Sequence, residues 1–168
     1  CGQRRVQMAF GPRKWRCSRC TESGAVCLAS GQACHAMATS KDILDIDKND
    51  FPLKTLAQRL GRIEDELING RGFVRIRGLD RNRYDQSEME MLYWGIGMHL
   101  GKPWAQNKRG HMLGDVTDQG RAADDPEARG NELGGIALPF HTDGSDLVGL
   151  LCLQDGIQGG LSKVAHSV

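Results

Sequence analysis

The feature that most constrains this chain is a histidine and an aspartate, two residues apart, just ahead of its most apolar run. Residues 138–153 read LPFHTDGSDLVGLLCL. Because side chains in a strand alternate between two faces, His141 and Asp143 should share one face while Thr142 points to the other. The nearly continuous apolar run at 147–153 is typical of a strand buried on both faces. The sequence therefore predicts an imidazole and a carboxylate side by side at the entrance to a core strand.

This pair has two interpretations. An imidazole nitrogen and a carboxylate oxygen on one face are two of the ligands of the two-His, one-carboxylate triad, which holds non-haem Fe(II) and leaves positions open for a co-substrate and O2. The spacing alone also fits a surface turn that precedes a core strand. The context favours the metal site, since Pro139 and Phe140 lead into the pair, Gly144 permits a tight bend, and the apolar run follows.

Other short motifs accompany the pair. They are FHTDG at 140–144, DLVGLLCL at 146–153, GGLS at 159–162, GRGFVRIRG at 70–78 and YWGIG at 93–97. Together they resemble the taurine dioxygenase-like (TauD/TfdA) family of Fe(II)- and 2-oxoglutarate-dependent dioxygenases, from about residue 51 to residue 168. The resemblance implies an α+β fold: a double-stranded β-helix (a jelly roll, clavaminate synthase-like) with flanking N-terminal helices. Such a roll needs about eight strands. We expect this sequence to hold only some of them, and therefore an incomplete roll.

The resemblance also implies roles for individual residues. His141 and Asp143 would bind Fe(II), with 2-oxoglutarate and O2 as co-substrates and ascorbate stimulating turnover. Ser162 stands where the family commonly has a Thr that hydrogen-bonds the co-substrate, although a plain strand serine is an equal alternative. Gln106 and Asn107, in the long polar stretch 102–132, are weaker candidates for binding a small-molecule substrate, as is His111. For these three residues ordinary loop polarity is the simpler interpretation.

Two family features have no counterpart in the sequence: the second iron-binding His and the Arg that pairs with the far carboxylate of 2-oxoglutarate. His166 stands where the resemblance suggests a small residue, so we do not assign it as the third ligand. We expect a dioxygenase fragment, truncated at its C-terminus, whose 168 residues alone are inactive. The alternatives are a catalytically dead jelly-roll fragment, or a zinc- and nucleic-acid-binding module that uses the Cys-rich head.

That head comprises residues 1–41, which show no sustained hydrophobic period. It holds five of the six cysteines, and Cys17, Cys20, Cys27 and Cys34 form a Cys-x2-Cys-x6-Cys-x6-Cys pattern. A Cys-x2-Cys knuckle can hold zinc, but here the second pair is split. We predict that residues 1–41 form an irregular, basic, disordered extension whose cysteines do not converge, and that residues 42–168 form the dioxygenase portion.

Composition narrows the partners. The net charge of +1 argues neither for nor against an anionic partner. The basic residues of the head fit a solvated tail better than a nucleic-acid site, so we do not expect a nucleic-acid partner. The sequence has no apolar run of the roughly 18 residues that a membrane span needs, and it shows no signal peptide. We therefore expect a cytoplasmic location and no membrane partner.

Periodicity predicts the remaining elements. A helix at 52–69 should bury Leu53, Leu56, Leu60, Ile63 and Leu67, with Asp50 as its cap and a left-handed stop at Asn69-Gly70. A second helix should begin with a capping box at Ser87 and Glu90 and end at Gly101, with Met91, Leu92, Ile96 and Leu100 facing the core. Strands are predicted at 72–78 and from 161 onward, while 102–132 should lack strong structure.

Overall fold

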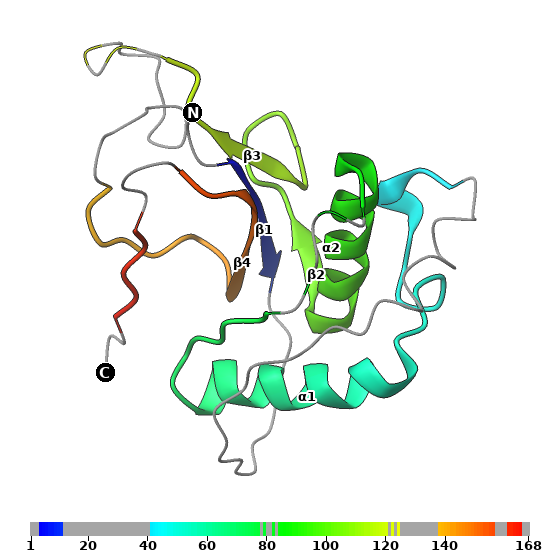
Figure 1. The fold of residues 1–168 in the computed structure, drawn as a ribbon. Coiled ribbons are helices and arrows are strands. Elements are labelled where there is room, and N and C mark those ends of the chain that lie inside the picture. The colour runs from blue at the N-terminus through cyan, green and yellow to red at the C-terminus, as the bar shows by residue number, and fades with distance from the viewer. Residues whose placement is uncertain are drawn as a thin grey trace. The chain divides into compact units, whose positions relative to one another are not determined.

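The computed structural model describes residues 4–11, 41–77, 79, 82, 84–120, 122, 124, 138–156 and 161–165. The chain divides into two compact units, one made of residues 1–11 and 103–163 and the other of residues 12–102 and 164–168. Helices lie in the second unit, and most of a four-stranded sheet lies in the first (Figure 1). The described residues are thus α+β, and within these ranges the strands do not close into a roll.

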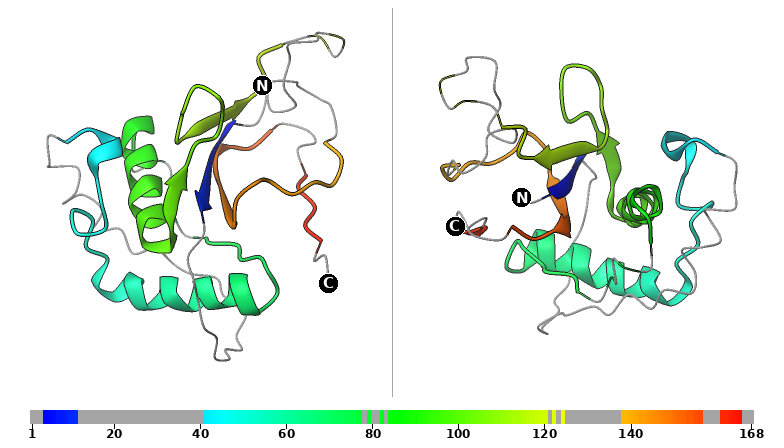
Figure 2. Two further views of the ribbon diagram at one scale, coloured as in Figure 1. Left: turned by 180° about the vertical axis from the view of Figure 1, so that it is seen from behind. Right: turned by 45° about the horizontal axis from the view of Figure 1, so that its top comes forward.

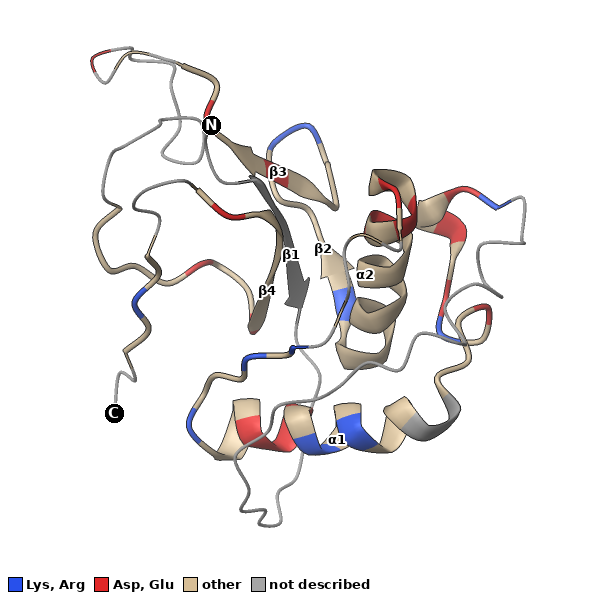
Figure 3. Ribbon diagram, viewed as in Figure 1, with Lys and Arg blue, Asp and Glu red and all other residues tan. Residues whose placement is uncertain are grey.

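Helix α1 (Lys54–Asn69) buries the predicted apolar stripe. Leu53, Leu60 and Ile63 are buried, and Leu56 and Leu67 are half-buried. Charged side chains of both signs occupy other positions along the helix (Figure 3). This pattern explains why the segment is helical: one face is apolar at spacings of three and four, and polar and charged residues occupy most other positions.

Both predicted ends of α1 need correction. The residue at the N-cap is Leu53, which makes no side-chain cap hydrogen bond, so Asp50 is not the cap. At the other end Gly70 has φ −103°, and the left-handed residue is Gly72 with φ 76°. The Gly72 N–H donates to the carbonyl of Glu66 at 3.3 Å, so the chain reverses two residues later than the sequence suggests.

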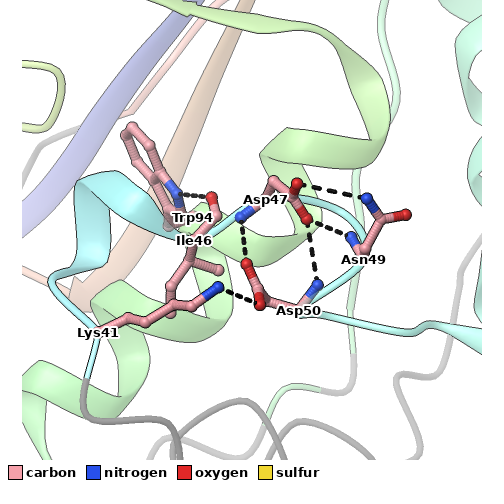
Figure 4. Close-up of polar contacts among 6 residues, drawn as sticks. All are labelled: Lys41, Ile46, Asp47, Asn49, Asp50 and Trp94. Carbon is pink, nitrogen blue, oxygen red and sulfur yellow. Dashed lines mark hydrogen bonds and ion pairs between the residues drawn. The ribbon is translucent and has the colours of Figure 1, made fainter.

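The carboxylate of Asp50 is engaged in the segment before α1, which also contains the 3-10 turn η2 (Ile43–Asp45). It accepts hydrogen bonds from Lys41 Nζ at 2.6 Å and from the N–H of Asp47 at 3.1 Å (Figure 4). The bond from Lys41 is the main reason why the pKa of Asp50 is lowered and that of Lys41 is raised. The nearby carbonyl of Ile46 accepts the indole N–H of Trp94 at 2.9 Å, which ties this segment to the second helix.

Helix α2 (Gln86–Leu100) begins with a capping box two residues earlier than predicted. The side chain of Asp85 accepts the N–H of Glu88 at 2.9 Å, and the side chain of Glu88 accepts the N–H of Asp85 at 2.8 Å. Ser87, the predicted cap, instead donates its hydroxyl to Asp85 at 2.7 Å. Asp-x-x-Glu satisfies the same two backbone donors as Ser-x-x-Glu, so the motif was correct in kind and wrong in register.

The buried face of α2 is wider than predicted. Leu92 and Ile96 are buried and Met91 and Leu100 half-buried, and further buried positions are Met89, Trp94, Gly95 and Gly97. After Glu90 the helix carries no Asp, Glu, Lys or Arg (Figure 3). It ends at Gly101, as predicted, where the Gly101 N–H donates to the carbonyl of Gly97.

The predicted strand at 72–78 is not formed. Residues 73–76 have no regular structure and Arg77 makes a single bridge. The expected alternation is nevertheless present, because Val74 and Ile76 are half-buried and Phe73, Arg75 and Arg77 are exposed. Alternating burial indicates which side chains share a face. A β-strand also requires a neighbouring strand with which its main chain forms hydrogen bonds.

Strand β1 (Arg4–Gly11) lies in the sheet between β4 (Leu147–Gln154) and β3 (Gly114–Thr117), as Figures 1 and 2 show. The prediction that residues 1–41 are irregular is therefore wrong for residues 4–11. Apolar residues at alternate positions 6, 8 and 10 are a short period-two signal, and the partners lie more than 100 residues further along the chain. Residues 12–40, which include Cys17, Cys20, Cys27 and Cys34, lie outside the described part.

The other strands modify three further predictions. The stretch 102–132 contains β2 (Lys102–Trp104) and β3, although it was expected to lack structure. Strand β4 is confirmed and one residue longer, but it is not buried on both faces: Val148 and Leu150 are 44% and 53% exposed, while Leu153 is 5% exposed. Residues 161–165 form no strand, and 166–168 are not described.

No helix in the described ranges is long and apolar enough to span a bilayer.

Candidate metal centre

His141 and Asp143 lie in the irregular segment that leads into β4, not in the strand itself. The Nε2 atom of His141 is 3.9 Å from Oδ1 of Asp143, and their side chains are 55% and 37% exposed. Two atoms that each bind one ion at about 2.1 Å stand no more than about 4.2 Å apart. The 3.9 Å separation lies within this upper limit, so it permits both atoms to bind one ion.

The orientation of the His141 ring is set by a backbone carbonyl. Its Nδ1 lies 2.9 Å from the oxygen of Pro139, and because a carbonyl only accepts, Nδ1 carries the proton and donates it. In the neutral ring this leaves the lone pair on Nε2, the nitrogen that faces Asp143. A ligating histidine commonly has this arrangement, with one nitrogen held by a carbonyl and the other open to a metal. Sequence patterns did not reveal this contact, because a main-chain acceptor has no side-chain signature.

Gly144 follows the pair, and its predicted role in a tight bend receives no structural support. Among the described residues the glycines with positive φ are Gly72, Gly110 and Gly120. A Cβ added to Gly144 would meet nothing within 4 Å. The bend at this position does not depend on glycine.

Gln106 and Asn107 lie in the turn between β2 and β3. Asn107 Oδ1 accepts the N–H of Arg109 at 2.9 Å and that of His111 at 3.3 Å, and its Nδ2 donates to His111 Nδ1 at 3.1 Å. Gln106 donates its amide to the carbonyl of Trp104 at 2.8 Å. Both side chains thus stabilise the turn, as the simpler interpretation holds, and their contact with a substrate stays a prediction.

Ser162 lies in the exposed segment 161–165, separated from β4 by residues outside the described part. Its role toward a co-substrate stays a prediction. Among the residues that the structure describes, no third His, Cys, Asp or Glu joins His141 and Asp143 in a group of three. The four cysteines of the head and His166 are not among those residues.

Comparison with known proteins defines the class of this chain. Residues 39–168 match the family described as taurine catabolism dioxygenase TauD, TfdA, and the chain belongs to this family. One similar protein is FR-33289 synthase of Streptomyces rubellomurinus, 26% identical over 126 residues that cover 75% of this chain and 37% of that protein. Another is taurine hydroxylase-like protein SAT17 of Stachybotrys chartarum, 26% identical over 159 residues, or 87% of this chain and 41% of that protein.

The chain therefore spans about two fifths of the length of the curated relatives it matches. No solved structure matches it.

Proposed function

We propose that this chain carries the first two iron ligands of an Fe(II)- and 2-oxoglutarate-dependent dioxygenase that oxidises a small organic molecule. Nε2 of His141 and a carboxylate oxygen of Asp143 would hold the metal, and Ser162 would contact the co-substrate. Membership of a dioxygenase family supports the reaction class. The observation that carries the residue assignment is the 3.9 Å separation of the pair, with Nδ1 of the histidine held by Pro139.

The donor set fits the metal, since imidazole nitrogen with carboxylate oxygen is the ligand chemistry of non-haem Fe(II) sites. When bound, Fe(II) together with 2-oxoglutarate and O2 would supply the oxidising power of the site. In such a reaction 2-oxoglutarate is converted to succinate and CO2. The protein contributes placement. Pro139 fixes the histidine tautomer, and Asp143 adds a negative charge beside the open nitrogen. Both side chains are accessible to a ligand from solvent.

The proposal extends to what these 168 residues lack. The second histidine, the arginine for 2-oxoglutarate and the remaining strands of a jelly roll would be supplied by a longer chain, in keeping with the greater length of the relatives. The 168 residues alone are then expected to bind metal weakly and to be inactive.

Titration of the chain with Co(II), as a spectroscopic substitute for Fe(II), tests the pair. His141→Ala and Asp143→Ala should each abolish the cobalt absorption that depends on the pair. His111→Ala and Asp146→Ala are matched controls, because each removes the same functional group from an exposed position in the described residues. Binding that survives both pair substitutions would point to the Cys-rich head and to the zinc alternative.

Succinate formation tests the reaction class. A longer natural chain that contains this sequence should form succinate slowly with Fe(II), 2-oxoglutarate, O2 and ascorbate, even without its prime substrate. His141→Ala or Asp143→Ala should abolish that activity. Turnover without iron would contradict the assignment, and vigorous succinate formation by the 168-residue chain would contradict its expected inactivity.

A further inference from the structure

The last residue of helix α1, Asn69, is exposed and is followed by a glycine. The side-chain amide of an asparagine can react with the main-chain nitrogen of the next residue, and a side chain on that residue hinders the approach. Because glycine has no Cβ, the pair Asn69-Gly70 is the most open arrangement for this reaction. The other four asparagines of the sequence precede Asp, Arg, Lys and Glu; they are Asn49, Asn82, Asn107 and Asn131.

Helix α1 closes its last turn differently from α2. At the end of α2 the cap glycine, Gly101, donates its N–H to the carbonyl four residues back at 3.0 Å. At the end of α1 the carbonyl of Glu66 accepts the N–H of Gly72, at 3.3 Å, which lies two residues beyond the cap. Helix ends also open at little cost in free energy. A local movement of the last turn therefore brings the Gly70 nitrogen to the side chain of Asn69.

Two other asparagines in the described ranges are held in ways that oppose the same reaction. The nitrogen that follows Asn49 is that of Asp50, and its N–H donates to Oδ1 of Asp47 at 3.2 Å. The amide of Asn107 is bound at both ends, because its oxygen accepts two backbone N–H groups and its nitrogen donates to His111. The fold thus restrains these two sites and leaves Asn69 at a helix end.

We propose that Asn69 is a site of spontaneous deamidation, with water as the co-reactant, and that the product loosens the end of α1. The Gly70 nitrogen forms a bond to Cγ of Asn69, and the side-chain nitrogen leaves as ammonia with the proton that Gly70 loses. Water then opens the resulting imide. Opening at the bond to Cγ gives aspartate, and opening at the main-chain carbonyl gives isoaspartate. Nothing is oxidised or reduced, and the reaction does not depend on iron binding.

The product would change the last turn of α1. Nδ2 of Asn69 donates to Oδ1 of Asp65 at 2.8 Å, one turn back. A carboxylate at position 69 cannot donate, so two negative charges would face each other at the helix end where the macrodipole disfavours them. Glu66 lies in the same turn and holds the next segment by its 2.6 Å bond from Nε of Arg71. Loosening the turn therefore loosens the start of that segment as well.

Glycine at position 70 is also needed for packing. A Cβ there would lie 2.7 Å from the main-chain oxygen of Glu66 and 2.8 Å from its carboxylate. Because the backbone oxygen has little freedom to move, a larger residue at position 70 would disturb the turn. The test variants are therefore made at Asn69 and Asp65 and not at Gly70.

The first measurement compares sites within the 168-residue chain. The chain is kept at mildly alkaline pH, either folded or in concentrated urea, and peptide mass spectrometry follows the conversion of each asparagine. In the folded chain Asn69 should react at least about tenfold faster than Asn49 or Asn107, and within about tenfold of its own rate in urea, because a helix end gives little protection. Equal rates at the three sites, or much stronger protection of Asn69 by folding, would overturn the proposal.

The second measurement tests the effect on α1. Asn69→Asp should lower the melting temperature by about 2–4 °C, since it places a second carboxylate beside Asp65. Asn69→Gln is the matched control: it keeps the uncharged amide and resists deamidation because a larger ring would have to form, so its melting temperature should stay near that of the native chain.

A double variant separates charge repulsion from a general loss of packing. Combining Asn69→Asp with Asp65→Asn exchanges donor and acceptor and should restore most of the lost melting temperature. If Asn69→Asp alone is as stable as the native chain, or if the double variant restores nothing, the proposed effect on α1 is wrong. These measurements need no metal, so their outcome is separate from that of the proposed function.

Discussion

The ring of Phe51 lies directly against the backbone of Gly95, where a Cβ would overlap the ring atoms. Phe51 precedes α1 and Gly95 lies in the middle of α2, and both residues are buried. An aromatic side chain therefore occupies the space that a side chain at position 95 would need. The contact fixes the segment before α1 against α2.

Gly95→Ala is expected to destabilise the protein. Alanine favours a helix by about 1 kcal/mol over glycine, but overpacking a buried site costs about 1–3 kcal/mol, and the enclosed ring has little room to move. We expect a net loss of up to about 2 kcal/mol in the free energy of unfolding, measured by urea denaturation. Gly61→Ala is the control, since nothing lies within 4 Å of its added Cβ and it should stabilise α1. A stabilising Gly95→Ala would contradict the packing.

Asp85 should make stability depend on pH. Its hydrogen bond from the N–H of Glu88, together with that from the Ser87 hydroxyl, lowers its pKa below the ordinary value of 3.8. A carboxyl whose pKa is lower in the folded state adds stability above its unfolded pKa, and this stability is lost as the pH falls through the folded pKa.

The measurement compares melting temperatures of the native chain and Asp85→Asn across pH. Asparagine keeps an oxygen for the Glu88 N–H but cannot ionise. The advantage of aspartate should be largest near neutral pH and shrink below pH 3.8. Asp85→Ala should be less stable than the native chain at neutral pH because the cap is lost. A difference between Asp85 and Asn that does not change with pH would refute the argument.

Asn107 distinguishes a turn-forming role from a substrate-binding one. Asn107→Ala removes an acceptor shared by two backbone N–H groups and should cost about 1 kcal/mol of stability. Asn107→Asp keeps that acceptor and loses only the donor to His111, so it should retain most of the stability. Chemical denaturation monitored by circular dichroism gives the comparison. If both variants are as stable as the native chain, the side chain is not needed for the turn.

Local pattern predicted the helices well and the sheet poorly. The stripe of α1 and the C-terminal end of α2 depend on residues close in sequence, so periodicity and capping chemistry were enough to find them. The caps were misplaced because several acceptors compete near each helix start, and Asp50 was engaged by Lys41. β1 was missed because eight residues carry little periodic signal and its partners are remote.

In the candidate site, too, the sequence indicates the placement of side chains but not the contacts of the backbone. The spacing of His141 and Asp143 predicts that they share a face, and the structure places their side chains together although the segment is not a strand. The carbonyl of Pro139 and the hydrogen bonds of Asn107 depend on backbone paths that no side-chain pattern encodes. Residue types indicate the ligand chemistry that we propose, whereas the surrounding backbone decides which atoms are available for it.

The position of β1 shows that the family match and the sheet begin at different residues of the chain. The match to the family as a whole starts at residue 39, but the compact unit that contains His141 and Asp143 starts before residue 11. An expression clone trimmed to the similar region would discard the middle of its own sheet and leave the hydrogen-bonding edge of β4 exposed to other molecules. For this chain the start chosen for expression decides whether the sheet keeps the strand that pairs with both β3 and β4.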